Sequence, residues 1–212
     1  MKIKTIKTAW GEGQLKQNTY IVEGDTTCII IDAGCPLAEI KKLTDKTIEA
    51  VFITHGHFDH INYIEEYDKL GVPIYASEQI KEFLTNTTLN ASYTDTCVYK
   101  VNNFVTVCEG DKIEALLGDI ECFETPGHSK DNMCYLIDGN LFSGDTVFSV
   151  AVGRTDLESG DVNTQIETLK KISKLDYTTL YAGHGRASTK KEQEINIPKW
   201  INILEQMKSR EV

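Results

Sequence analysis

The residues of this chain best suited to chemistry are its histidines, which fall in three short stretches that each follow a predicted strand. They are His55, His57 and His60 (with Asp59 among them), His128 in Thr-Pro-Gly-His-Ser, and His184 in Ala-Gly-His-Gly; Asp145 in Phe-Ser-Gly-Asp also follows a predicted strand. Within a strand or helix such side chains would face different ways, but at strand ends several can point into one crevice. We therefore expect a single site built from all of them.

A bound divalent cation is the function that this cluster predicts, because burying so many titratable groups without a counter-charge is costly. Imidazole and carboxylate without thiolate suit zinc, and also iron, manganese, nickel or cobalt. Five histidines and two aspartates exceed one tetrahedral site but fit two ions that share a carboxylate. Such ions lower the pKa of bound water from about 15.7 toward 7, so no Ser or Cys nucleophile is required.

The composition narrows the class of protein. The chain has 212 residues and a formal net charge of −10, which disfavours a broad phosphate-binding surface and hence nucleic acid as a partner. No apolar run approaches the roughly 20 residues of a membrane span, and the N-terminus lacks the apolar core of a signal peptide. Six cysteines without a C-x-x-C pair favour free thiols in a reducing cytoplasm. We expect a small-molecule substrate; the oligomeric state stays open.

The elements that must position the site alternate along one predicted domain, residues 1–212. The patterns predict an N-terminal strand, a hairpin of Thr19–Val22 and Cys28–Ile31, a strand Ala50–Thr54, helices Leu37–Leu43, Ile61–Leu70 and Asp161–Leu175, and a closing helix opened by Pro198. The polar segment 85–103 is either a lid or a plain surface loop. Two rounds of strands followed by helices predict an α/β fold with two packed sheets and helices outside.

The motif His55-x-His57-x-Asp59-His60, followed by His128, Asp145 and His184, resembles that of the metallo-β-lactamase fold superfamily. Asp32 in Ile-Ile-Asp-Ala-Gly is similar to that family's D-x-G turn, which helps to orient the ligands. The resemblance implies an αββα sandwich of two mixed β-sheets packed face to face. It also implies that His55, His57 and His128 bind a first metal, that Asp59, His60 and His184 bind a second, and that Asp145 bridges them.

Within the superfamily, Thr-Pro-Gly-His-Ser, Phe-Ser-Gly-Asp-Thr-Val-Phe and the segment Val152–Asp156 resemble short bacterial glyoxalase II-like hydrolases. The resemblance implies two zinc ions per chain, with iron or manganese as alternatives, and a bridging hydroxide that cleaves a small thioester such as S-lactoylglutathione or a related acyl ester. Asp59 and Asp145 would be the catalytic carboxylates. Arg154 is the candidate to meet a substrate carboxylate; an ion pair with Asp156 or Asp161 is the other interpretation.

Three alternatives to thioester hydrolysis remain. Relatives of the persulfide dioxygenase type use one iron, which would be held here by His55, His128 and Asp145. A lactonase would use the same two-metal site. A third hypothesis is a metal-braced scaffold without activity, although structural zinc sites are usually rich in thiolate.

Overall fold

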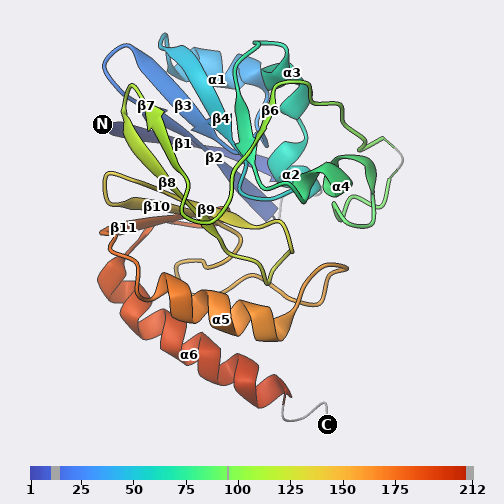
Figure 1. Cartoon of the computed structure of the whole chain (residues 1–212), viewed down its shortest axis with the longest axis vertical. Helices are drawn as coiled ribbons and strands as arrows, with labels where there is room; N and C mark the ends of the chain where they lie inside the picture. Colours follow the sequence, from blue (N-terminus) through green and yellow to red (C-terminus); the bar gives the residue numbers. More distant parts are fainter. Residues whose placement is uncertain (11–14, 95, 209–212) are drawn as a thin grey trace.

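Two six-stranded sheets form the centre of the computed structural model, which describes residues 1–10, 15–94 and 96–208 (Figure 1). The first sheet contains β1 (Lys2–Trp10), β2 (Leu15–Glu23), β3 (Thr27–Ile31), β4 (Thr47–Phe52), β5 (Ile74–Ala76) and β6 (Phe104–Thr106), in that order. The three strands β1 to β3 pair antiparallel, and β3 to β6 pair parallel. The sheet is therefore mixed, as expected, and the hairpin of β2 and β3 is confirmed.

The second sheet has the order β12-β11-β10-β9-β8-β7. Its strands are β7 (Lys112–Ala115), β8 (Gly118–Glu124), β9 (Met133–Ile137), β10 (Asn140–Gly144), β11 (Thr179–Ala182) and β12 (Ser188–Thr189). All neighbours pair antiparallel except β10 and β11, which are parallel. As a result β8, β10 and β11 run in the same direction and end at the same edge of the sheet.

Hydrophobic packing divides the molecule into four layers. Successive residues of β3 serve two different cores: Cys28 and Ile30 pack toward the helices, whereas Ile29 and Ile31 pack between the sheets against residues such as Tyr135. A strand buried on both faces explains the uninterrupted apolar run in the sequence. A third core joins the outer face of the second sheet to the C-terminal helices. The fold is thus an αββα sandwich, as predicted.

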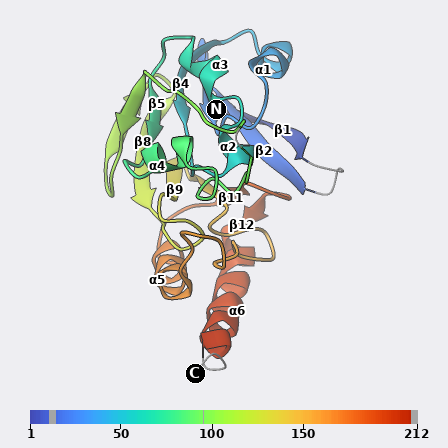
Figure 2. The same cartoon turned by 90° about the vertical axis from the view of Figure 1, so that its right-hand side faces the viewer.

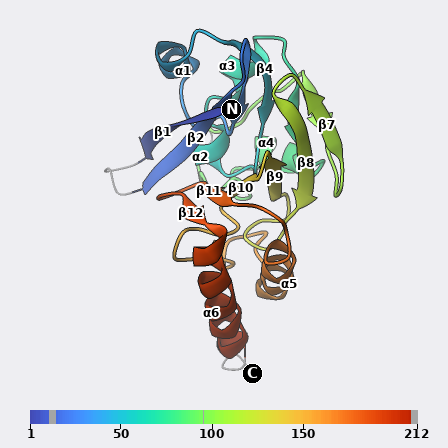
Figure 3. The same ribbon diagram turned by 90° about the vertical axis from the view of Figure 1, so that its left-hand side faces the viewer.

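Helices cover both outer faces. Those of the first half are α1 (Leu37–Leu43), α2 (Phe58–Ile61), α3 (Ile64–Asp68) and α4 (Ile80–Thr85); those of the second are α5 (Val162–Ile172) and α6 (Lys190–Lys208). Figures 2 and 3 show α1 and α3 at one end of the molecule and α5 and α6 at the other. Among the described residues, no helix combines the length and apolar character that a membrane crossing needs.

The expected helix Ile61–Leu70 is wrong in its boundaries, since the structure has two short helices there that begin at Phe58. The break occurs because the main-chain N–H of Tyr63 donates to Ala33 O (2.9 Å) in the turn after β3 instead of continuing a helix. In return, Ala33 N–H donates to His60 O (2.7 Å). These two bonds fix α2 against the end of β3.

The closing helix also differs from the prediction, because Pro198 lies inside α6 and does not open it. An interior proline costs a helix about 3 kcal/mol. The helix continues because Ile197 and Leu204 are buried in the core shared with α5. The strand β7 was not predicted, as its alternation of exposed and half-buried residues gives only a weak apolar signal.

Candidate metal centre

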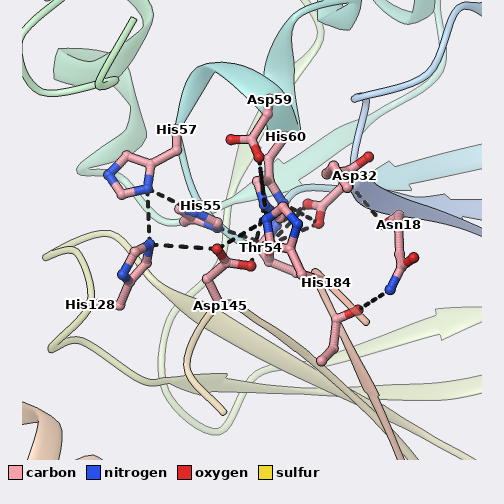
Figure 4. Close-up of polar contacts among 12 residues, drawn as sticks. Asn18, Asp32, Thr54, His55, His57, Asp59, His60, His128, Asp145 and His184 are labelled. Atoms are coloured by element: carbon pink, nitrogen blue, oxygen red, sulfur yellow. Dashed lines mark hydrogen bonds and ion pairs between the residues drawn. The ribbon is translucent and has the colours of Figure 1, made fainter. Parts of the chain in front are cut away.

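Side chains from both sheets meet at the carboxyl ends of their strands (Figure 4). His55 follows β4, His128 follows β8, Asp145 follows β10 and His184 follows β11. The histidines were expected at strand ends, but His60 lies in α2 together with Asp59. Because α2 starts directly after His57, its first turn returns both side chains to the same crevice. The structure therefore brings all seven predicted ligands together.

The first set consists of three buried imidazoles, those of His55, His57 and His128. His57 Nδ1 lies 3.1 Å from His55 Nε2 and 2.9 Å from His128 Nε2. Ligand atoms about 2.0–2.1 Å from a tetrahedral zinc ion would be separated by roughly 3.3 Å, so this spacing is close to that of one coordination sphere. Burial, reinforced by neighbouring imidazoles, lowers the pKa of His57 to about 3 and that of His55 well below its ordinary value. These rings are neutral and able to donate a lone pair.

The second set consists of Asp59, His60 and His184. Asp59 Oδ2 lies 3.3 Å from His184 Nε2 and 3.8 Å from His60 Nε2. Burial opposes charge on these groups, but the carboxylates around His60 outweigh it and raise the pKa of that imidazole. Asp145 and Asp59 likewise raise the pKa of His184 to about 10. This half of the crevice therefore has a strongly negative field that favours positive charge.

Asp145 lies between the two sets. Its Oδ1 is 3.4 Å from His60 Nε2, and its Oδ2 is 3.3 Å from His184 Nε2 and 3.8 Å from His128 Nε2. Although burial opposes ionisation, His184 and His60 hold the pKa of this carboxyl well below its usual range. Asp145 is the carboxylate that contacts members of both sets, which is the arrangement the bridging assignment requires.

The ring nitrogens that face away from the crevice fix the orientation of three histidines. Nδ1 of His60, His128 and His184 lies 2.7, 2.7 and 2.9 Å from Asp32 Oδ2, Arg154 O and Lys16 O respectively. Each acceptor takes the Nδ1 proton, so Nε2 is the atom of each ring that faces the crevice and can coordinate a cation once it is deprotonated. His57 is the exception, because its Nδ1 faces the other rings and its buried Nε2 has no hydrogen-bond partner among the described residues.

Asp32 is held in a conformation that suits this role. Its φ of 65° lies in the left-handed region, which Asp tolerates better than most residues. The main-chain N–H of Thr54 donates to Asp32 Oδ1 (2.8 Å), and the Thr54 hydroxyl donates to both oxygens (3.0 Å each). The carboxylate is therefore oriented from the end of β4 while it receives the proton of His60, as the family resemblance implies.

The donor set fits a pair of cations. The buried atoms His60 Nε2 and Asp145 Oδ1 have no hydrogen-bond partner among the described residues, and such orphaned polar atoms are costly unless something satisfies them. All six cysteines are free thiols and none belongs to these ligand groups. Imidazole and carboxylate donors without thiolate suit zinc, iron or manganese.

Asp131 is a residue of the site that the sequence reasoning missed. It is fully buried, and its Oδ2 accepts the main-chain N–H of Gly56 (2.6 Å), between the ligands His55 and His57. A Cβ at Gly56 would lie only 2.4 Å from Cβ of Phe83, so the loop needs glycine there. The signal available in the sequence was the acid three residues after His128.

A cavity of about 520 Å³ opens over the ligands and is lined in part by Arg154. The guanidinium of Arg154 donates from Nε and Nη2 to the two carboxylate oxygens of Asp156, both at 2.6 Å. The ion-pair interpretation is therefore observed with Asp156, while Asp161 instead caps α5 by accepting from Thr164 N–H. Binding of a substrate carboxylate by Arg154 stays a prediction.

Comparison with known protein families identifies the family of this chain. The sequence model of the metallo-beta-lactamase superfamily matches residues 13–184. The chain belongs to this superfamily. Among curated proteins it is similar to the probable metallo-hydrolase YqgX of Bacillus subtilis, with 30% identity over 82% of this chain and 87% of that protein. It is also similar to the hydroxyacylglutathione hydrolase of Photobacterium profundum, with 32% identity over 76% of this chain but only 58% of that enzyme.

Solved structures of the superfamily share the fold. The crystal structure of the B3 metallo-beta-lactamase BLEG-1 superposes with a TM-score of 0.82 and 27% identity, covering 93% of this chain and 99% of that one. The di-iron-bound form of TTHA1623 gives a TM-score of 0.76 and 25% identity, covering 92% and 99%. One of these relatives is thus described with two irons and the other as a B3 metallo-beta-lactamase.

Proposed function

We propose that this protein is a metal-dependent hydrolase that cleaves a small thioester or a related acyl ester at a pair of zinc ions. The observation that carries the proposal is the pair of three-residue ligand sets beneath an open cavity, with Asp145 between them and in contact with members of both. Membership of the superfamily and the similarity to relatives named as metallo-hydrolase and hydroxyacylglutathione hydrolase support it.

His55, His57 and His128 would hold one ion, and Asp59, His60 and His184 the other. When bound, two such cations lower the pKa of water toward 7 and polarise the oxygen of an acyl group. The protein's own contribution is orientation: Asp145 lies between the two sets, and the outer hydrogen bonds keep the imidazoles of His60, His128 and His184 in one tautomer. The lining of the cavity contains no Ser, Thr or Cys among the described residues, which favours attack by water over an acyl-enzyme route.

The oxidoreductase alternative would use one iron on His55, His128 and Asp145. It would leave four further assembled donors, His57, Asp59, His60 and His184, without a role. Iron nevertheless suits the same donor types, so metal content separates the two hypotheses directly.

The test is elemental analysis of the purified protein together with a substrate panel. We expect about two equivalents of metal per chain, hydrolysis of thioesters or acyl esters, and loss of that hydrolysis on chelation with recovery on adding zinc. The panel contains S-lactoylglutathione, uncharged thioesters, lactones and glutathione persulfide, the last followed by oxygen consumption. One equivalent of iron with persulfide oxidation, or no ester cleavage by the two-metal protein, would overturn the proposal.

A further inference from the structure

Apart from the candidate ligands, the cavity wall is largely apolar. It is formed by Phe58, Ala91, Tyr93, Phe148, Val152 and Leu157. Apolar walls favour an apolar ligand because burying its surface is worth roughly 25 cal/mol per Å². A compound rich in carboxylates would lose hydration against this wall without gaining partners.

The positive charge of Arg154 at the mouth of the cavity is already paired with the carboxylate of Asp156. Arg154 is the only lysine or arginine among the described residues that line the cavity. The Nε and Nη2 edge of its guanidinium donates two hydrogen bonds to Asp156, in the bidentate geometry that a substrate carboxylate would need. An anionic ligand therefore has to displace Asp156 or lie beside its negative charge.

Part of the apolar wall is built into the fold through Asn90. The buried side chain of Asn90 donates from Nδ2 to Phe83 O (3.1 Å) and Cys97 O (2.9 Å), and its main-chain oxygen accepts the N–H of Phe58 (2.9 Å). The segment 90–93 is thereby tied to the start of α2, which carries Asp59.

Two residues of this segment hold unfavourable backbone conformations. Ala91 and Tyr93 have φ values of 56° and 54°, although neither is glycine. Such conformations cost about 1–3 kcal/mol each and persist only where the surroundings enforce them. They set Ala91 and Tyr93 on the cavity, with the Tyr93 side chain largely exposed at its mouth. The wall is thus a formed surface with a defined chemical character.

We propose that the cavity selects uncharged, apolar acyl thioesters or esters over glutathione conjugates, and that Asp156 determines this selectivity by occupying Arg154. This inference narrows the substrate class of the proposed function and rests on it. Asp156 would act through Arg154 and so is a positioning residue, without contact with the reacting atoms.

The test compares two thioethers that carry the same hexyl chain and cannot be hydrolysed: S-hexylglutathione, which is anionic, and N-acetyl-S-hexylcysteamine, which is neutral. Calorimetry on the zinc-loaded protein gives a Kd for each. We expect the neutral compound to bind at least about tenfold more tightly. In Asp156→Asn, Arg154 is released and the ratio of the two Kd values shifts by about tenfold toward the glutathione compound.

The matched control is Glu158→Gln, which removes one negative charge from an exposed acid two residues further along the same segment. We expect this control to leave the ratio of the two Kd values unchanged. Tighter or equal binding of S-hexylglutathione by the wild type overturns the inference. So does an equal shift in both variants, because general electrostatics would then replace the specific pair.

Hydrolysis of the corresponding hexanoyl thioesters, measured in parallel, separates this inference from the proposed function. Turnover of both compounds with preference for the glutathione thioester overturns the selectivity but leaves the hydrolase proposal intact. Binding with the expected ratio but no turnover of either compound overturns the hydrolase proposal and leaves the selectivity of the cavity in place. Turnover with preference for the neutral thioester supports both.

Discussion

Replacement of Asp32 by Asn tests whether the contacts behind the ligands hold metal. In the wild type, Asp32 Oδ2 takes the Nδ1 proton of His60 at 2.7 Å, and Oδ1 takes the main-chain N–H of Thr54 at 2.8 Å. An Asn amide has one oxygen, so one of these donors must face an NH2 group. Asn tolerates the left-handed backbone at this position, where φ is 65°, so the change is electrostatic and leaves the backbone unchanged.

The expected loss of zinc-binding free energy is that of one charge-assisted hydrogen bond, about 1.5–3 kcal/mol. If the NH2 group faces His60, its Nδ1 becomes the acceptor and the proton moves to Nε2, which is the atom that faces Asp59 and Asp145. At about 1.4 kcal/mol per factor of ten, we expect one of the two metal affinities to fall roughly 10- to 100-fold.

The assay is competition between the metal-free protein and a chromophoric chelator, titrated with zinc. The matched control is Asp68→Asn, which alters another buried carboxylate that accepts main-chain N–H groups from Asn102 and Asn103 but lies outside the cavity lining. We expect the control to lose stability and keep both zinc affinities. Wild-type zinc binding by Asp32→Asn, or an equal loss in the control, would refute the reasoning.

Three further changes have defined outcomes. Asp145→Ala removes a donor that contacts both sets and should lower kcat roughly 100-fold or more. Arg154→Ala at the exposed mouth should spare kcat and act on KM only for a substrate that carries a carboxylate, and equal losses of kcat in the two variants, measured by steady-state kinetics, would contradict the bridging assignment. Burial raises the pKa of Asp131 to about 6 from 3.8. The folded state therefore holds a proton that the unfolded state has lost, and the free energy of unfolding falls by up to about 3 kcal/mol as the pH rises from 4 to 6. Urea unfolding of the metal-free protein should show this decrease, and Asp131→Asn should abolish it. In Gly183→Ala the new Cβ would lie 2.1 Å from Asp145 Oδ1 and 2.6 Å from His60 Cε1. We expect this clash to lower the free energy of unfolding by about 1–3 kcal/mol and to reduce the zinc content of the purified protein. A variant with full zinc content and the wild-type melting temperature would contradict the close contact.

The sequence predicted those features of the site that depend on side-chain type. Three histidines and Asp59 within six residues already indicate a metal site, because no regular element buries such a group without a partner. Asp32 was singled out because Ile-Ile-Asp-Ala-Gly resembles the family's D-x-G turn, and in the structure its carboxylate accepts the Nδ1 proton of His60. The sandwich followed from alternating strands and helices.

What the sequence left out depends on main-chain atoms and tertiary packing. The acceptors for His128 and His184 are the main-chain carbonyl oxygens of Arg154 and Lys16. Every residue has such a carbonyl, so the sequence cannot indicate which ones accept these protons. The position of Pro198 misled the helix prediction, because burial of the neighbouring Ile197 outweighs a local preference. The boundary of α2 depended on a hydrogen bond to Ala33, which is distant in sequence.

The carbonyls that orient the ligands come from opposite halves of the molecule. Lys16 belongs to β2, where Asn18 N–H also donates to Gly183 O (2.7 Å), while Arg154 lies in the segment before α5. Ordering of the ligands therefore depends on the pairing of the N-terminal hairpin with the C-terminal half. We therefore expect amide exchange in β2 and in the segment around Arg154 to slow when the centre binds metal.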